Sequence, residues 1–232
     1  RAAVDGGPVP HYQAGVYLDV ARHAESGKER EQAQQWCSLM TPVLKAAWTQ
    51  QAFEGASACL QVFGGHGYIR EWGIEQIVRD SRVAMIYEGT NEIQAIDLLV
   101  RKVLPDGGQA MGQWLLLLRK ALDDGRPLDA EVLRGLAQLR YFTTVLAQAC
   151  KEDDTLAWRV ADDYLRCVAV LLLGWAWARI AATEGTDGER WQGPLMQVQQ
   201  RILPEMDWRM SLMKSQWAQA SVVHGNQLYA AA

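Results

Sequence analysis

The chain has 232 residues, of which 49% are hydrophobic, enough for one large domain or two small ones around a buried core. Lysine and arginine number 23 against 27 aspartates and glutamates, and the resulting net charge of -4 argues against a general nucleic-acid binder. Four widely spaced cysteines predict neither a zinc or redox motif nor a disulfide framework, so we expect reduced cysteines in a cytoplasmic protein.

Helix-forming residues dominate the first half of the chain, and their apolar spacing predicts an all-α protein. Residues 1–10 contain Gly6-Gly7-Pro8 and are expected to form a loop or ragged end. Gly64-Gly65 should stop a long helix, and Asn91 is expected to be the N-cap of a later one. The helices predicted in this half cover residues 12–25, 28–63, 72–82 and about 91–104.

The second half is predicted to be a separate helical domain. Leu104-Pro105-Asp106-Gly107-Gly108 ends the preceding helix, which predicts one domain over residues 1–104 and another over residues 105–232. The run over residues 168–180 is too short to span a bilayer and predicts a buried helix, so no membrane span is expected. The helices predicted here cover residues 111–122, 129–150, 155–182 and 195–223, with a loop over 185–194 and a break near Pro204.

Glu88 is the candidate with the most suggestive surroundings. It lies between apolar residues and a Gly89-Thr90 turn, directly before a predicted helix start. Apolar walls beside a carboxylate suit a general base for a weakly acidic C–H bond, and free N–H groups at a helix start can face a ligand. Taken alone, these residues favour the simpler interpretation of an electrostatic partner for the helix start.

Three motifs in fixed order surround Glu88 and point to a function more specifically than this residue does alone. They are Gly64-Gly65-x-Gly67-Tyr68, then Arg79-Asp80, then Tyr87-Glu88-Gly89-Thr90 followed by Ile93-Gln94. Together they resemble the C-terminal signature of the acyl-CoA dehydrogenases, over roughly residues 10–104. The resemblance implies a helical bundle of the acyl-CoA dehydrogenase C-terminal type.

The resemblance also implies roles for individual residues. Glu88 would be the catalytic base that removes the α-proton of an acyl-CoA thioester, with hydride transfer to the flavin N5 and a trans-2-enoyl-CoA product. Its backbone N–H would bind the thioester carbonyl, and Gly89 would border the substrate. FAD would be contacted by two stretches: Gln61, Val62, Phe63, Gly64 and Gly65, and Thr90, Asn91 and Glu92.

The same resemblance implies partners and an assembly. The first FAD stretch is expected to reach the FAD of a neighbouring subunit in a homo-oligomer, and an electron-transfer flavoprotein would accept the electrons. Glu92 departs from the small or amide residue that is usual at its position. No metal site is expected, since the four histidines form no pair at helical spacing.

Beyond Pro105 the resemblance narrows to a bacterial subgroup that includes the 3-methylmercaptopropionyl-CoA dehydrogenases. Residues 109–232 carry no catalytic motif, and their many tryptophans predict a core or a subunit interface. Thr183-Glu184-Gly185-Thr186 echoes the glutamate motif only superficially and is predicted to be a loop.

The family also has an N-terminal helical domain and a middle β domain. We therefore expect this chain to be a fragment that lacks both, together with the first bundle helix, and to be inactive alone. An apolar face left open by the missing helix would favour self-association. Two alternatives remain open: an acyl-CoA oxidase, and a non-catalytic helical assembly module.

Overall fold

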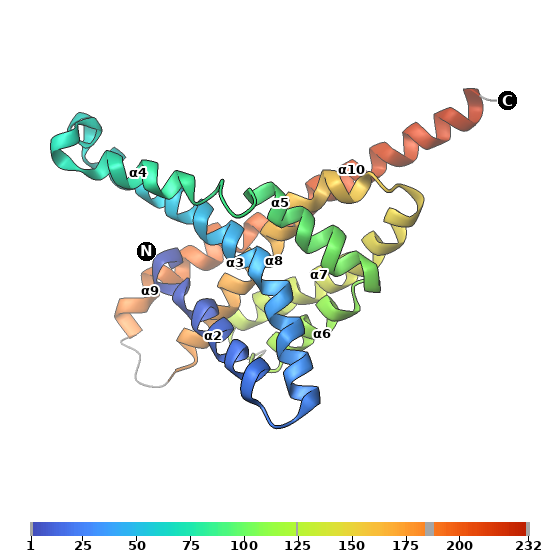
Figure 1. Ribbon diagram of the computed structural model, residues 1–232, viewed down its shortest axis with the longest axis horizontal. Helices are drawn as coiled ribbons and strands as arrows, with labels where there is room; N and C mark the ends of the chain where they lie inside the picture. The colour runs from blue at the N-terminus through green and yellow to red at the C-terminus, as the bar shows by residue number, and fades with distance from the viewer. Residues whose placement is uncertain (1, 124, 184–187, 231–232) are drawn as a thin grey trace.

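The computed structural model describes residues 2–123, 125–183 and 188–230 (Figure 1). Helices and turns account for all of the described secondary structure, with no strand among these residues, which confirms the all-α class. The four cysteines, Cys37, Cys59, Cys150 and Cys167, are all free.

The first half contains the long helix that the sequence predicts. Residues 2–10, predicted as part of a loop or ragged end, are instead helical, because Pro8 supplies the first turn of a helix, where its missing N–H does no harm. The backbone before it is held by the indole of Trp177, which donates to the Ala2 carbonyl at 2.6 Å. The elements of this half are α1 (Ala2–Gly6), α2 (Pro8–His23), α3 (Gly27–Val62), η1 (Gly64–Tyr68), η2 (Arg70–Trp72), α4 (Ile74–Val83), α5 (Asn91–Ile96), η3 (Asp97–Val103) and η4 (Leu104–Asp106).

The second half follows the predicted order of helices with one correction. Residues 188–194 are helical and not a loop, and Pro194 lies inside that helix. Residues 184–187, which include most of the Thr183–Thr186 motif, lie outside the described residues. Pro204 begins the last helix, as the predicted break requires. The elements are α6 (Gln109–Arg119), α7 (Pro127–Glu152), α8 (Leu156–Ala181), α9 (Gly188–Gln197), η5 (Val198–Ile202) and α10 (Pro204–Ala230).

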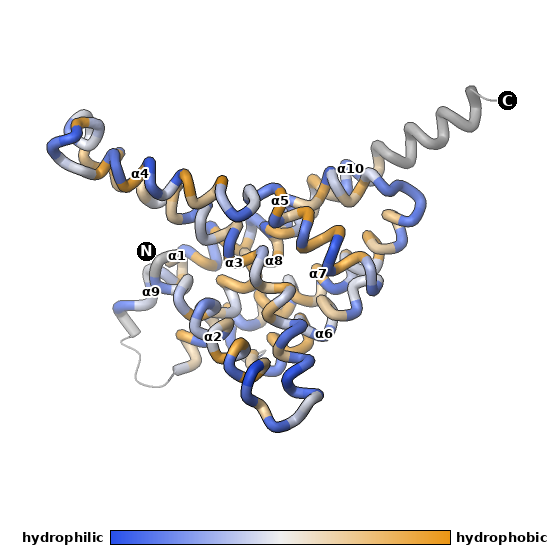
Figure 2. Tube along the Cα trace, in the orientation of Figure 1, coloured by the Kyte–Doolittle hydropathy of each residue, from blue (hydrophilic) through white to orange (hydrophobic). Residues whose placement is uncertain are grey.

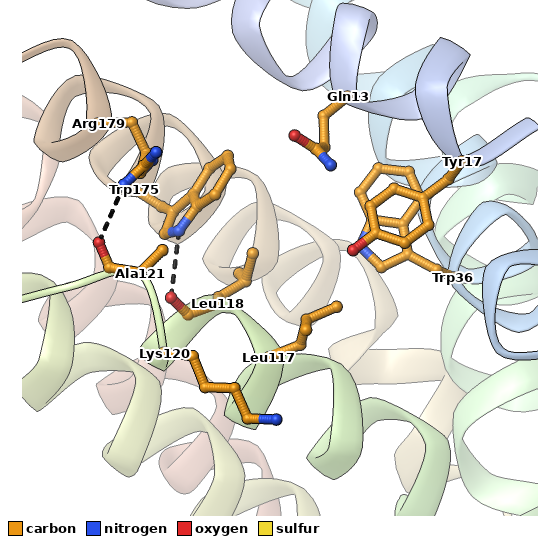
Figure 3. Close-up of a pocket in the computed structure, with 9 residues that line it drawn as sticks. All are labelled: Gln13, Tyr17, Trp36, Leu117, Leu118, Lys120, Ala121, Trp175 and Arg179. Carbon is orange, nitrogen blue, oxygen red and sulfur yellow. Dashed lines mark hydrogen bonds between the residues drawn. The ribbon is translucent and has the colours of Figure 1, made fainter. Parts of the chain in front are cut away.

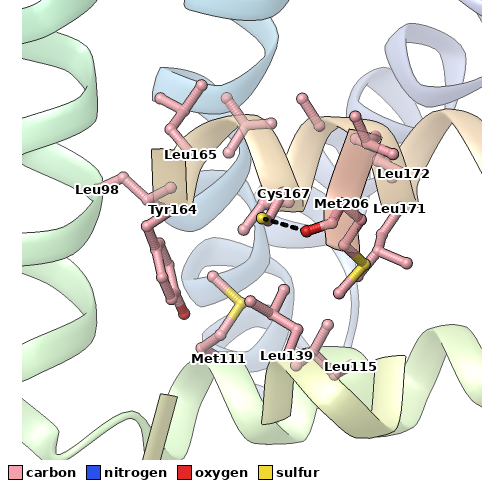
Figure 4. Close-up of a cluster of buried hydrophobic side chains, with 14 of the residues drawn as sticks. Leu98, Met111, Leu115, Leu139, Tyr164, Leu165, Cys167, Leu171, Leu172 and Met206 are labelled. Carbon is pink, nitrogen blue, oxygen red and sulfur yellow. Dashed lines mark hydrogen bonds between the residues drawn. The ribbon is translucent and has the colours of Figure 1, made fainter. Parts of the chain in front are cut away.

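Helix α8 forms the centre of the molecule. Figure 4 shows its side chains Tyr164, Cys167 and Leu171 among residues from η3, α6, α7 and α10. By length and composition alone α8 could cross a membrane, but 78% of its apolar stretch is buried inside the protein. The predicted buried helix over residues 168–180 is therefore confirmed as a core element.

The predicted boundary at residue 104 falls inside this common core. Helix α8 contacts α3, α5 and η3, and buried residues of both halves form one hydrophobic cluster. The junction itself is ordered: the Asp106 carboxylate accepts hydrogen bonds from the backbone N–H groups of Gly108, Gln109 and Ala110 at 2.8–3.0 Å. The division into two domains stays a prediction, and any such domains share their interior.

Two parts of the chain project from this body, the C-terminal end of α10 and a segment that carries α4 (Figure 1). The last turns of α3 form an arm with η1, η2 and α4 (Figure 1), and α4 packs against α3, η1 and η2. We call residues 50–83 the arm. Apolar and polar positions alternate along it (Figure 2). Its large exposed apolar side chains are Val62, Phe63, Tyr68, Ile69, Trp72, Ile77 and Val83.

Candidate functional site

The turn between α4 and α5 carries Glu88 in an unusual backbone conformation. Glu88 has φ 56° and Gly89 has φ 84°, and among the described residues Glu88 is the only non-glycine with positive φ. A left-handed conformation costs an L-residue about 1–2 kcal/mol, so the surrounding contacts must hold it in place.

Those contacts come from the middle of α3. The Lys45 ammonium donates to the Gly89 carbonyl at 2.6 Å and to Asn91 Oδ1 at 3.0 Å. Thr49 Oγ1 donates to the same Asn91 oxygen at 3.1 Å, and Asn91 Nδ2 donates to the Ala46 carbonyl at 3.1 Å. The buried side chain of Asn91 is thus engaged with α3, although its FAD contact stays a prediction.

The opposite side of the turn is open. The Glu88 side chain is exposed, and its own carbonyl is held by Gln94 Nε2 at 3.0 Å. Within the described chain, the backbone N–H groups of Glu88, Gly89 and Thr90 have no acceptor. An exposed carboxylate is therefore followed in the chain by partly exposed residues, and three consecutive backbone donors here have no partner.

The helix start differs by one residue from the prediction. Thr90, not Asn91, is the N-cap of α5, and its Oγ1 accepts from the Ile93 N–H at 3.4 Å. Asn91 instead points its amide at α3, which is the reason it does not cap the helix. Hydrogen bonding with Thr90 holds the pKa of the exposed Glu92 below its usual range.

The other predicted FAD stretch lies at the far end of the arm. Gln61 to Gly65 are all exposed, and Val62 is 86% exposed. Gly67 is required by packing, since a Cβ there would meet the Leu60 carbonyl at 2.6 Å. Gly65 has no such neighbour and no positive φ, so the fold of this chain gives no reason for glycine there. Open space above its backbone suits the approach of a bound group.

The two stretches do not meet in this chain. Thr49 contacts Asn91, and Gln61 lies further along the same helix. At about 1.5 Å of rise per residue, α3 separates Thr49 from Gln61 by about 18 Å. Residues 61–65 and residues 90–92 therefore lie at opposite ends of the arm.

Other residues of the motif region make only local contacts in the structure. Asp80 Oδ1 accepts from Gln76 Nε2 at 2.7 Å, and no ion pair of Arg79 or Asp80 occurs among the described residues. His66 packs edge-on against Trp72 at a centroid distance of 5.4 Å. No group of three potential metal ligands occurs in the described ranges.

A hollow of about 300 Å³ lies elsewhere, between α2, α3, α6 and α8 (Figure 3). Tyr17 stacks on Trp36 at one side of it, at a centroid distance of 4.6 Å. At the other side, Trp175 Nε1 donates to the Leu118 carbonyl at 3.2 Å. Its lining includes none of the predicted site residues, so this hollow adds nothing to the Glu88 site.

Lys45, Thr49 and Gln94 were not predicted as site residues. Lys45 interrupts an apolar stretch of α3, between Leu44 and Ala46, and Thr49 follows one helical turn later. A cation and a hydroxyl spaced four residues apart on a buried face signal a polar partner. The sequence does not show that this partner lies more than forty residues away.

Residues 15–103 match the family model described as "Acyl-CoA dehydrogenase, C-terminal domain". The chain is 33% identical over 182 residues to the 3-methylmercaptopropionyl-CoA dehydrogenase of Ruegeria pomeroyi, a match that covers 75% of this chain and 31% of that protein. It is 31% identical over 156 residues to the broad-specificity linear acyl-CoA dehydrogenase FadE5 of Mycobacterium tuberculosis, covering 62% and 26%.

The fold is similar to a solved structure, Caenorhabditis elegans ACDH-11 in complex with C11-CoA. The two share 21% identity with a TM-score of 0.66, over 87% of this chain and 35% of that one. The chain thus spans about a third or less of the length of the proteins it resembles.

Proposed function

Since residues 15–103 are an acyl-CoA dehydrogenase C-terminal domain, we propose that this chain is part of an enzyme that oxidises an acyl-CoA thioester to a trans-2-enoyl-CoA. The observation that carries the proposal is the Glu88 turn, where an exposed carboxylate is held in a left-handed conformation beside three unused N–H donors. Strained residues of this kind are concentrated at functional sites.

In the proposed reaction, the Glu88 carboxylate removes the proton from the α-carbon of the bound thioester. The free N–H of Glu88 donates to the thioester carbonyl, which stabilises the negative charge that develops on that oxygen. Gly89 has no side chain and lets the acyl group lie close to the turn. Bound FAD supplies the hydride acceptor at its N5.

Two groups of residues fit the cofactor. Thr90 offers an unused backbone N–H at the start of α5, where the helix dipole favours the negative charge of a diphosphate. Gly65 leaves its backbone uncovered at the arm tip. The residues that would hold FAD are Gln61, Val62, Phe63, Gly64, Gly65, Thr90, Asn91 and Glu92.

The separation of these two groups supports a site completed by a second subunit. Because α3 holds them about 18 Å apart, residues 61–65 can serve an FAD bound to another copy of the protein. The exposed apolar side chains of the arm are suited to an oligomer contact. We therefore propose a homo-oligomer in which the arm of one subunit reaches its neighbour.

The electron acceptor is proposed to be an electron-transfer flavoprotein. An acyl-CoA oxidase would use the same base. It differs from a dehydrogenase in that oxygen, and not an electron-transfer flavoprotein, reoxidises its reduced flavin. Oxygen consumption during turnover by the intact protein separates them: rapid consumption with acyl-CoA alone favours the oxidase.

The test uses the intact protein that contains this chain, with wild-type Glu88 and with Glu88→Gln. A panel of acyl-CoAs is added without oxygen, and the visible absorbance of the flavin is followed. The wild type should bleach, while Glu88→Gln should bind acyl-CoA and stay oxidised. Equal bleaching of both proteins would place the base elsewhere, and a protein that never carries flavin would favour an assembly role.

A further inference from the structure

Lys45 lies directly beneath the Glu88 turn. It belongs to the middle of α3, it is half-buried, and its ammonium joins two acceptors more than forty residues away, the Gly89 carbonyl and Asn91 Oδ1. One acceptor belongs to the turn itself and the other to the first turn of α5. A single side chain therefore connects α3 to two points directly after Glu88, the Gly89 carbonyl and the start of α5.

The two acceptors of Lys45 differ in what else holds them. Asn91 is held to α3 by Thr49 and by the Ala46 carbonyl, so it cannot follow a displaced turn. The Gly89 carbonyl, in contrast, has Lys45 as its donor in the described chain. A hydrogen bond from a charged donor is stronger than one between neutral groups, so the Lys45 bond can help to hold the left-handed backbone at Glu88 and Gly89.

Lys45 also lies within the electrostatic reach of the site's carboxylates. Burial lowers the pKa of the Lys45 ammonium, while the negative charges of Glu92 and Glu88 partly oppose that effect. The ammonium is hydrogen-bonded to the backbone of the turn, and the Glu88 side chain is exposed.

We infer that Lys45 is a positioning residue for the reaction, which holds the Gly89 carbonyl so that Glu88 and its N–H face the substrate together. This rests on the proposed function of Glu88. Lys45 itself touches no reacting atom. Its loss should let the strained turn relax, and a displacement of about 1 Å in a reacting group can slow chemistry by about 100-fold.

Lys102 provides a matched control. Its ammonium also reaches α3, where it donates to the Ser38 carbonyl at 2.8 Å, and it pairs with Asp97 at 2.7 Å. It is likewise half-buried, but its partners lie away from the Glu88 turn. Replacing it removes an equivalent helix-to-helix contact without touching the site.

The experiment compares Lys45→Met, Lys45→Arg and Lys102→Met in the intact flavoprotein. For each, the dissociation constant of an acyl-CoA and the rate of flavin reduction at saturating acyl-CoA are measured without oxygen, along with Tm. Lys45→Met should slow reduction about 100-fold while affinity changes by less than about fivefold. Lys45→Arg should recover at least about tenfold of that loss, because it keeps a cationic donor. Lys102→Met should lower Tm similarly and leave the reduction rate unchanged.

Three results would overturn the inference: reduction of Lys45→Met within about threefold of wild type, equal slowing in Lys102→Met, or an effect confined to affinity. If Lys45→Met does not fold, Lys45→Gln decides, since it keeps a polar side chain in α3 but removes the charged donor to the Gly89 carbonyl. It should slow reduction several-fold at saturating acyl-CoA, and an unchanged rate contradicts the inference.

Wild type and Glu88→Gln are run in parallel. Failure of the wild type to bleach refutes the proposed function, whereas normal bleaching with an inert Glu88→Gln leaves Lys45 as the point under test.

Discussion

Glu88 combines an exposed carboxylate with a backbone conformation that glycine adopts more easily than any other residue. The chain retains a side chain there despite a cost of about 1–2 kcal/mol. Such a residue is expected where activity, and not stability, determines the choice. The stability cost of a side chain at this left-handed position can be measured without any substrate.

Glu88→Gly should be more stable than Glu88→Ala by about 1 kcal/mol. Both variants remove the carboxylate, but only glycine relaxes at φ 56°. In ordinary helices the order is reversed, with alanine favoured over glycine by about 1 kcal/mol. Denaturant unfolding of the two variants measures the difference, and a more stable alanine variant would contradict the assigned conformation.

At this scale the sequence predicted a turn at Glu88-Gly89-Thr90 before a helix, because glycine and a capping residue are local signals. It did not predict Lys45 or Thr49, since their partners lie across the bundle and leave no periodic trace. For the same reason Asn91 was expected to cap its helix, whereas its amide is bonded to α3.

At the scale of elements, the burial of side chains along α5 and η3 also could not be predicted fully from the sequence. Regular helical spacing would place Ile93 on one apolar face with Leu99 and Val103, which are buried, yet Ile93 is 46% exposed. The helix changes from α to π geometry at Asp97, and the extra residue in each turn rotates later side chains relative to earlier ones. A constant period of 3.6 residues cannot anticipate that change.

The junction between η4 and α6 gives an element-scale prediction. Gly107 and Gly108 both have positive φ, but only at Gly108 would a Cβ meet another atom, Thr143 Cγ2 at 2.5 Å. Thr143 is buried and bonded to Tyr164, so it cannot move aside. Gly107→Ala should lower the free energy of unfolding by about 1–2 kcal/mol, and Gly108→Ala by about 1–3 kcal/mol more. Equal losses in denaturant titrations would show that the junction is loose.

The start of α8 gives a pH prediction. Hydrogen bonds from Thr155 and the Arg159 guanidinium hold the pKa of Asp153 at about 2. A depressed folded-state pKa stabilises the fold above the unfolded pKa of about 3.9, and this contribution disappears as pH falls towards 2. Asp153→Asn should therefore destabilise the protein at pH 7 and match wild type near pH 2.

The neighbouring Asp154 is the control for that experiment. It is exposed, and Asp154→Asn should change stability by less than about 0.5 kcal/mol at pH 7. Thermal unfolding across the pH range measures both variants. A constant gap between wild type and Asp153→Asn down to pH 2 would show that the carboxylate charge is not responsible.

For the whole molecule, the order and lengths of most helices follow from the sequence, but the position of α8 at the centre does not. Its apolar composition predicts burial without saying which helices surround it. Leu98 and Leu99 of the first half are fully buried in the same cluster as Leu171 and Leu172 of α8. Residues 105–232, which include α8, thus contribute to the interior that supports the Glu88 turn.

Residues 1–104 alone should consequently fail to fold cooperatively. Removing residues 105–232 deletes α8 and exposes Leu98, Leu99 and Val103 to water, at about 1.5–3 kcal/mol for each large side chain. Thermal unfolding followed by circular dichroism, with residues 1–232 as the reference, measures this. A sharp transition in the shorter chain would mean that residues 1–104 fold independently, so that the predicted boundary separates two domains.

The central claim, that Glu88 is the base, is tested most directly by proton exchange. The intact protein that contains this chain is incubated in D2O with an acyl-CoA that has no hydrogen on its β-carbon, so that hydride transfer cannot follow. Mass spectrometry then measures deuterium at the α-carbon. Wild type should exchange the α-protons, and Glu88→Gln should do so at least about 100-fold more slowly while still binding the thioester. Exchange at equal rates in the two proteins would show that another residue removes the proton.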